Sequence, residues 1–353
     1  MGEKPEKITS KEIAKLAGVS VSTVSIVLNN KSGVSQETRD RVTAILNAHG
    51  IVPREPTNVS NGSRKTLQFC KIVKHGGIIN ERHNVFLSDY IDGVIQKANE
   101  LGYSVQVTTY QNIALSHIVS QLETAPDISG CVLLGTELAE EDLDFFGSLS
   151  IPHVFLDTNY PCRKGMFVTM DNHKMVTDAM DHLVANGHRH IGMLLPTGAA
   201  NFFARYQAFT NYMKRKDLPL DEKDLVPVKS TLTGAYESMK AFLKTANLKA
   251  LPTAFFACND IIAIGAIRAL QEKGIRVPEQ VSVIGFDDLP ASALINPALT
   301  TMSVPKIRIG GLAVQMLIHN MNMKGEFESS KSELGGSLIV RNSVRSLVQE
   351  AVE

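Results

Sequence analysis

Carboxylate and amide side chains stand where several apolar runs of this sequence end. HVFLDT places Asp157 there, AFFACND places Asn259 and Asp260, and VIGFDD places Asp287 and Asp288. Ligands of parallel α/β sheets bind outside the carboxyl ends of the strands, so these groups could hydrogen-bond a small polar molecule. The two adjacent aspartates could instead hold a metal or transfer protons. Because neighbouring side chains diverge at a strand end, ligand binding is the favoured chemistry.

The sequence offers no complete signature of catalysis. It contains no GxxxxGK[ST], GxGxxG or GxSxG motif, so nucleotide hydrolysis, a dinucleotide site and an esterase elbow lack support. His182, His188 and His190 could bind zinc, or could instead meet the negative end of a helix near GHRHIG. We predict no catalytic residue, no metal and no cofactor. Lys74 and His75 end an early apolar run, where we expect a role in a binding cleft.

These groups need a scaffold, and the chain alternates apolar runs with amphipathic stretches from residue 67 onward. Strands are expected within 69–75, 103–110, 130–135, 153–158, 190–196, 254–260 and 281–288. Helices are expected near 86–101, 113–124, 173–186, 203–216, 234–246 and 261–273. Such alternation predicts parallel sheets covered by helices on both faces. The segment is too long for one sheet, so we predict an α/β body of two doubly wound subdomains.

Length and composition are those of a globular protein with two or three domains. The chain has 353 residues, with 36 Lys and Arg against 36 Asp and Glu. No window approaches ~20 uninterrupted apolar residues, which predicts no membrane partner. The polar start lacks the apolar run of a signal peptide, and the four cysteines show no paired spacing. We therefore expect a cytoplasmic protein with reduced thiols.

Residues 9–50 carry the pattern of three short helices. Thr9 and Glu12 form a capping-box pattern, Gly18 suits a left-handed helix end, and Ser20 can cap the next helix. Two helices joined by a tight turn, with a third that closes the core, predict an all-α helix-turn-helix head. Residues 1–66 hold ten Lys and Arg against six Asp and Glu, which favours nucleic acid as the partner of the head. Residues 51–66 are rich in Pro, Gly, Ser and Asn, which predicts a linker.

The motifs AGVS, STVS, VLNN and ETRDRV stand in this head at the spacing found in one regulator family. The stretch ITSKEIAKLAGVSVSTVSIVLNN resembles the DNA-binding head of the lactose-repressor (LacI/GalR) family. The resemblance implies that the second helix enters the major groove of double-stranded DNA. It implies base reading by Val21, Ser22 and Ile26, and contacts near the DNA backbone by Ser20, Thr23, Ser25, Asn29, Ser35 and Thr38. Plain helix capping is the alternative for Thr23, Ser35 and Thr38.

Two departures from that family concern how the operator is bound. The family commonly has Arg where this chain has Ile26, which cannot donate a hydrogen bond to guanine and can only touch thymine methyls. The family's hinge helix wedges a Leu into the minor groove, and that position falls on Ser60. Pro56 could begin one short helical turn, with Val59 as a weak wedge. A weaker or differently docked hinge is therefore expected.

The resemblance continues through the body. ACNDIIAIGAIRAL, VSVIGFDDLPASALINPALTT and the late LIVRNS match the family, which implies a periplasmic-binding-protein-like fold crossed three times by the chain. By that alignment Asp157, Arg205, Asn259 and Asp287 occupy effector-binding positions. Phe86, Phe202 and Phe286 could offer apolar faces to a sugar ring, with core packing as the alternative. The implied effector is a sugar, glycoside or sugar acid, and Lys74 and His75 leave room for an anionic sugar or a disaccharide.

The resemblance also sets the expected domains and partners. We expect a DNA-binding head at 1–50, a hinge at 51–66, one effector-binding subdomain at 67–166 and 303–331, and the other at 167–302 and 332–353. A homodimer formed through the first subdomain would place two heads on a pseudo-palindromic operator. The expected function is a transcription regulator, most often a repressor in this family. A solute-binding protein and an enzyme on the same scaffold are the alternatives, and the attached head argues against both.

Overall fold

The computed structural model describes residues 9–28, 34–49, 65–79, 84–125, 127–323 and 329–348. The chain divides into two compact units, Met1–Arg64 and Lys65–Glu353. The predicted linker therefore extends two residues too far, because Lys65 belongs to the second unit and strand pairing begins at Thr66. Asn29 and the hinge positions Pro56, Val59 and Ser60 lie outside the described residues.

The first unit is the predicted three-helix head, formed by α1 (Ser10–Ala17), α2 (Val21–Leu28) and α3 (Gln36–Ala48). The capping box is present: the Thr9 hydroxyl accepts from the Glu12 amide, and the Glu12 carboxylate accepts from the Thr9 amide. Gly18 ends α1 with a φ of 65°, a left-handed conformation that glycine adopts at no steric cost. Apolar side chains from all three helices form one core: Ile13, Ala14, Ala17, Val24, Val27, Val42 and Leu46.

The second unit begins with a parallel sheet in the strand order β11-β5-β4-β3-β1-β2. Its strands are β1 (Thr66–Val73), β2 (Ser104–Gln111), β3 (Ile128–Leu134), β4 (His153–Leu156), β5 (Met166–Met170) and β11 (Ser330–Leu334). Its helices are α4 (Asn84–Glu100), α5 (Leu115–Glu123), α6 (Leu143–Phe146) and α12 (Lys306–Asn322). The central strands are buried on both faces, which is why they appear in the sequence as continuous apolar runs.

The second sheet has the order β12-β10-β9-β8-β6-β7, with only β12 antiparallel to its neighbour. Its strands are β6 (Ile191–Leu195), β7 (Leu225–Pro227), β8 (Ala254–Ala257), β9 (Ser282–Asp287), β10 (Thr300–Ser303) and β12 (Ser337–Ile339). Its helices are α7 (Asn172–Ala185), α8 (Ala200–Arg215), α9 (Leu232–Thr245), α10 (Asp260–Glu272) and α11 (Pro290–Leu294), with 3-10 turns η2 (Glu222–Asp224) and η3 (Leu248–Ala250). The predicted pair of doubly wound subdomains is confirmed.

The chain passes between the two sheets three times, after β5, β10 and β11. Each predicted boundary is wrong by a few residues, because a division after 166, 302 or 331 would cut one of these strands. Backbone hydrogen bonding assigns a whole strand to one sheet, so the first subdomain keeps β5 and β11 and the second keeps β10.

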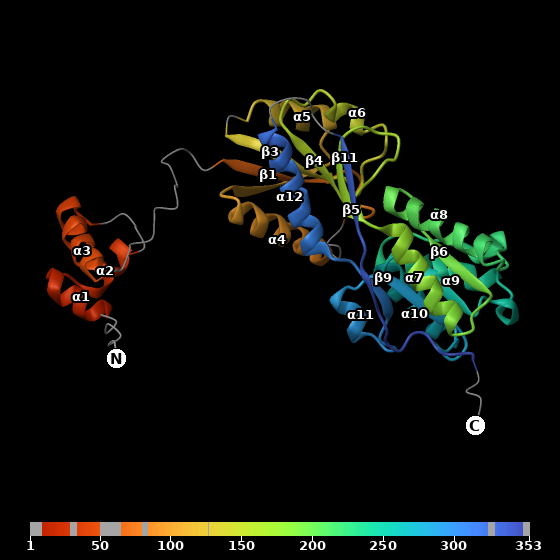
Figure 1. Ribbon diagram of the computed structural model, residues 1–353. Helices are drawn as coiled ribbons and strands as arrows, with labels where there is room; N and C mark the ends of the chain where they lie inside the picture. The colour runs from red at the N-terminus through yellow and green to blue at the C-terminus, as the bar shows by residue number, and fades with distance from the viewer. Residues whose placement is uncertain are drawn as a thin grey trace. The chain divides into compact units, whose positions relative to one another are not determined.

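Helix α12 returns the chain to the first subdomain and packs against α4 (Figure 1). The two helices approach so closely that a Cβ added at Gly93 would lie 2.1 Å from the carbonyl oxygen of Ile307. On the partner helix, a Cβ at Gly310 would lie 2.3 Å from the carbonyl oxygen of Tyr90. Glycine at both positions thus permits this close contact, which fixes the first turn of α12. Lys306 belongs to that turn and lies beside the cleft described below.

Candidate functional site

The predicted recognition helix α2 presents short polar side chains and leaves its apolar stripe in the core. Ser20 caps the helix, since its Oγ accepts from the Thr23 amide at 3.1 Å and lies 2.6 Å from the Ser22 Oγ. Val21, Ser22 and Ser25 are exposed, whereas Thr23 and Ile26 are half-buried. Val21, with 44% of its surface exposed, is thus available to touch a thymine methyl.

The N-terminus of α3 is also capped. The Ser35 Oγ accepts from the Thr38 amide at 3.3 Å and lies 2.9 Å from the Thr38 hydroxyl. Of the three residues for which capping was the alternative, only Ser35 caps a helix, whereas Thr23 and Thr38 supply the amides that Ser20 and Ser35 cap. Capping leaves these exposed hydroxyls at helix N-termini, where phosphate is favoured as well, so a DNA contact stays a prediction for them.

In the second unit, a small cavity lies where the two subdomains meet, and it brings together six of the eight predicted effector residues. The six are Phe86, Asp157, Phe202, Arg205, Asn259 and Asp287. The cavity holds only about 30 Å³, which is roughly one water molecule. The cleft therefore leaves little free space between its own side chains, and a ligand ring needs these side chains or the two subdomains to move apart.

Asp157 directly follows β4, has a φ of 63° and accepts hydrogen bonds from both subdomains. The Tyr90 hydroxyl donates to Oδ1 at 2.9 Å, and the Thr136 hydroxyl donates to Oδ2 at 2.5 Å. From α8, the Asn201 amide donates to Oδ1 at 3.1 Å and to the Asp157 carbonyl at 2.9 Å. Burial raises the pKa of Asp157, although these hydrogen bonds oppose the shift.

Arg205 occupies the centre of the cleft from the second turn of α8 and is 3% exposed. Its Nε donates to the Asn172 side-chain oxygen at 2.9 Å, and its Nη1 donates to the Cys258 carbonyl at 2.5 Å. The guanidinium carbon lies 3.6 Å from the ring centroid of Phe286, a cation–π distance. Phe286 is fully buried beneath Arg205 and does not line the cavity, so for it core packing is the correct reading.

Asp287 ends β9 with a φ of 115°, a strained conformation for a residue with a side chain. Its Oδ1 lies 3.8 Å from the Arg205 Nη2, too far for a hydrogen bond. Burial raises the pKa of Asp287 to about 8, and the neighbouring guanidinium lowers it only in part. The neighbouring Asp288 turns away and binds Arg341 at 2.7 Å, so the two aspartates do not act as a pair.

The raised pKa predicts how Asp287→Asn changes stability with pH. The unfolded carboxyl loses its proton near its usual pKa of about 3.9, whereas the folded one keeps it to about 8. Between these values the folded state binds more protons, so ionisation lowers the free energy of unfolding as pH rises. We expect the variant to melt several degrees above the parent protein at pH 8.5 and close to it at pH 4.5. Thermal unfolding at both pH values, with Asp288→Asn as control, measures this, and equal pH slopes in variant and parent would refute it.

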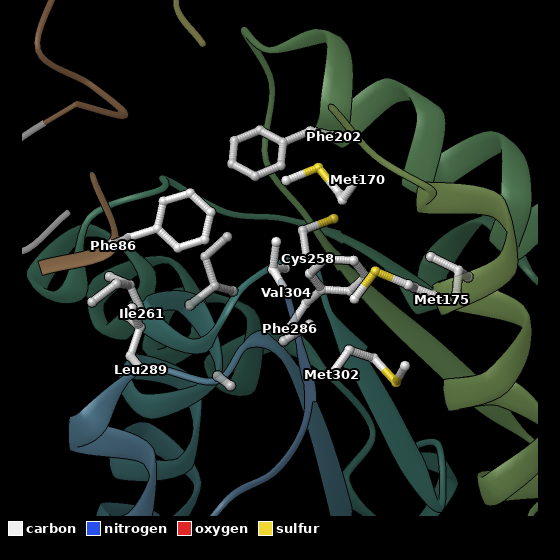
Figure 2. Close-up of a cluster of buried hydrophobic side chains, with 14 of the residues drawn as sticks. Phe86, Met170, Met175, Phe202, Cys258, Ile261, Phe286, Leu289, Met302 and Val304 are labelled. Atoms are coloured by element: carbon white, nitrogen blue, oxygen red, sulfur yellow. The ribbon is translucent and has the colours of Figure 1, made fainter. Parts of the chain in front are cut away.

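Asn259, Phe86 and Phe202 complete the predicted set. The Asn259 side chain caps α10 by accepting from the Ile262 amide at 2.9 Å. Figure 2 shows the rings of Phe86 and Phe202 near Met170 and Val304, within one apolar cluster that includes residues of both subdomains. The rings of Phe86 and Phe202 thus line the cavity and also belong to the core. A role in ligand binding and a role in core packing do not exclude each other for these two residues.

Lys74 and His75 do not line the cavity, and that part of the predicted site is not supported. The Lys74 Nζ binds Asp142 at 2.5 Å, and the His75 Nδ1 accepts from the Gly77 amide at 3.0 Å. Their loop is held by the buried carboxylate of Glu137, which accepts from the backbone amides of Lys74, His75, Gly76, Ile78 and Ile79 at 2.8–3.1 Å. Burial alone would raise the pKa of Glu137, but these hydrogen bonds lower it.

The histidines near GHRHIG have structural partners. His188 is buried and lies 2.9 Å from the Thr253 hydroxyl, and burial lowers its pKa to about 4. His190 binds Asp224 at 2.7 Å. Within the described ranges, no group of three or more His, Cys, Asp or Glu side chains is placed to hold a metal ion. No helix in those ranges is long and apolar enough to cross a membrane.

Sequence reasoning missed four polar residues of the cleft: Tyr90, Thr136, Asn172 and Asn201. Asn201 could have been found, because it precedes Arg205 by one helical turn and so shares its face. The other three contact Asp157 or Arg205 from elements far away in the chain, and no local pattern marks them.

Comparison with known proteins agrees with both units. A family described as "Bacterial regulatory proteins, lacI family" matches residues 9–54, and "Periplasmic binding protein-like domain" matches residues 180–344. The HTH-type transcriptional repressor PurR of Haemophilus influenzae (strain PittEE) is 31% identical over 348 residues, covering 96% of this chain and 99% of its own. The PurR of Pasteurella multocida (strain Pm70) is 32% identical over 347 residues, with the same coverage.

Solved structures share the fold. A complex of the transcriptional regulator CelR with cellobiose, and the lac repressor dimer bound to operator and the anti-inducer ONPF, each match with a TM-score of 0.70 and 23% identity. Each match covers 96% of this chain and 100% of the other.

A helix-turn-helix head followed by a body of two subdomains, with a cleft between those subdomains, defines the class of ligand-responsive DNA-binding regulators. The chain belongs to the lacI family of bacterial regulatory proteins, and it is a DNA-binding transcriptional repressor and not an enzyme.

Proposed function

We propose that a carbohydrate-type effector binds in the central cleft and thereby changes the affinity of the head for a pseudo-palindromic operator. The observation that carries this proposal is the convergence of Asp157, Arg205 and Asp287 on one cavity between the two subdomains. In this proposal the repressor works in the cytoplasm as a homodimer, so that two identical heads meet two half-sites.

Hydrogen bonds between the two subdomains hold one arrangement of them, and an effector would change how much of the protein adopts that arrangement. Asn201 of the second subdomain binds Asp157 of the first, as described above. The Ser230 hydroxyl, also from the second subdomain, donates to the Gly77 carbonyl at 2.6 Å. An effector that binds one arrangement of the subdomains more tightly than the other shifts the equilibrium by that difference in affinity. Operator affinity then changes by the same coupling, typically ~1–3 kcal/mol.

A polyhydroxylated ring fits the chemistry of the cleft. The carboxyl groups of Asp157 and Asp287 can accept from hydroxyls, the guanidinium of Arg205 donates, and Asn201 can do both. Phe86 and Phe202 offer apolar faces to the ring carbons, as is usual in mostly apolar ligand pockets.

Thermal unfolding against a ligand panel tests the effector class. The panel holds mono- and disaccharides, sugar acids, sugar phosphates and nucleobases. A ligand at 100 times its dissociation constant adds about 2.7 kcal/mol to the folded state, which is visible as a higher melting temperature. We expect neutral sugars to give the largest rise. A rise only with nucleobases would overturn the carbohydrate class while leaving the cleft as the effector site, and a uniformly unchanged melting temperature would overturn both.

The second helix allows a separate test of base reading through Ile26→Arg. Arg reads guanine by two hydrogen bonds, and a bidentate pair gives ~1–3 kcal/mol of discrimination between bases. We expect duplexes selected from a random pool by the variant to gain a guanine in each half-site. Such a duplex should bind the variant about 5- to 150-fold better than the matched duplex without guanine. The parent protein selected from the same pool is the control. Identical preferred sites for the two proteins would place residue 26 away from the bases.

A further inference from the structure

A second, larger cavity adjoins the closed central one. This outer chamber holds about 430 Å³, within the usual range for small-molecule sites, and shares Ala199 and Asn201 with the central cavity. Both subdomains line it: Tyr160 comes from the loop after β4, and Phe203 comes from α8. A molecule bound in the chamber would therefore touch both subdomains, as the central ligand would.

Helix α8 serves both cavities with different faces. Phe202 and Arg205 line the central cavity, whereas Phe203 and Gln207, one turn apart, line the outer chamber. Small side chains at Ala200 and Ala204 leave space beside them. Phe203 is 61% exposed, although its neighbour Phe202 is 4% exposed. An aromatic side chain left uncovered inside a concave pocket is a ready stacking face for a ligand ring.

A second aromatic residue in the wall of the chamber is held in place by a hydrogen bond. The Tyr160 hydroxyl donates to the Leu138 carbonyl at 2.7 Å, which orients its ring in the wall of the chamber. The chamber thus has one anchored aromatic side chain from the first subdomain and one exposed aromatic side chain from the second.

The charges of the chamber disfavour an anionic guest. Among the described residues that line it there is no Lys or Arg and His173 is the only basic side chain, while Glu140 and Glu333 are both present. Arg163 does not line the chamber and is already bound to Glu140 at 3.2 Å and to Asp144 at 2.7 Å. Amide and carboxylate groups at Gln207, Glu140 and Glu333 can instead serve hydroxyls as acceptors.

We propose that the outer chamber is a subsite for a neutral, hydroxyl-rich ring, the second unit of a disaccharide or glycoside whose first unit occupies the central cleft. This inference rests on the proposed function, because it takes the central cleft as a sugar site. The chamber selects against sugar phosphates and sugar acids, and Phe203 supplies the stacking face that a monosaccharide in the central cleft does not reach.

Calorimetric titration of the full chain with matched sugars tests the subsite. Glucose is compared with cellobiose and maltose, and galactose with lactose, while glucose 6-phosphate and adenine represent the excluded classes. We expect at least one disaccharide to bind more tightly than its monosaccharide. Phe203→Ala should weaken that disaccharide about five- to tenfold, the usual scale of one aromatic contact, and leave the monosaccharide unchanged. Gln207→Ala is a second variant with an exposed side chain and should act in the same direction.

The control is Phe145→Ala, which removes another exposed aromatic side chain, 48% exposed, from α6 and lines neither cavity. If a monosaccharide binds as well as its disaccharides, or if neither variant changes disaccharide affinity, the subsite is wrong while the central sugar site stands. If no sugar binds, or if adenine or glucose 6-phosphate alone binds, the proposed carbohydrate effector and the subsite both fail.

Discussion

Arg205→Ala is expected to weaken effector binding by roughly 10- to 150-fold. Hydrogen bonds from a charged group contribute about 1.5–3 kcal/mol each, and a ligand in the cleft would lose at least one. The loss is specific to the cleft, because Arg205 is buried and its contacts all lie within the second unit. Affinity for DNA in the absence of effector should stay within a few fold of the parent. Calorimetry with the effector and fluorescence anisotropy with labelled operator measure the two quantities.

The same substitution also lowers stability, since it leaves Asn172, the Cys258 carbonyl and Asp287 without their cation. Leaving a buried acceptor without its hydrogen-bond donor typically costs about 1–3 kcal/mol. Arg215→Ala controls for loss of an arginine from the same helix, because Arg215 is exposed in the last turn of α8. Circular dichroism at the assay temperature separates unfolding from loss of binding. An ordinary effector response in folded Arg205→Ala protein would refute the assignment of the cleft.

Deletion of residues 1–50 is expected to remove sequence-specific operator binding while the body still binds its effector. Specific affinity typically exceeds nonspecific affinity by about 10³- to 10⁷-fold, and all predicted base-reading residues lie within the deleted segment. The body should survive, because residues 65–353 form a compact unit with their own core. Anisotropy with the operator and with a scrambled duplex of equal length measures specificity.

Effector titration of the truncated protein is the control, and we expect a dissociation constant within about twofold of the parent, since the central cavity is lined only by residues of the second unit. Retained preference for the operator over the scrambled duplex would mean that the head is not the DNA-reading element. A truncated protein that melts normally yet binds no effector would show that the head is needed for the effector site.

The sequence predicted the subdomains well where strands are buried on both faces. β3, β4, β8 and β9 are continuous apolar runs, and their polar ends mark the cleft at Asp157 and Asp287. The boundaries could not be placed from the sequence, because β11 pairs with β5 and β12 pairs with β10, and neither partner is the preceding strand of the chain. Register and partner choice of that kind leave no local signal.

Lys74 and His75 show the limit for the site. Their place at a strand end predicted a cleft role, yet Asp142 and Glu137 bind their side chains or backbone from more than 60 residues away. The carboxylate of Glu137 is buried among five amides, and nothing in its local sequence announces this. Conversely, the exposed Phe203 beside the buried Phe202 could not be distinguished in the string NFFAR, because only the packing of α8 decides which ring is covered.

The most direct test of the central claim is operator affinity measured with and without effector on the full chain. The operator is the duplex selected from a random pool, and the effector is the ligand with the largest rise in melting temperature. A coupling of ~1–3 kcal/mol predicts a change in the operator dissociation constant of roughly 5- to 150-fold, with operator changing effector affinity by the same factor. Operator affinity that is identical at zero and saturating effector would contradict the account, because the cleft would then bind a ligand without controlling the head.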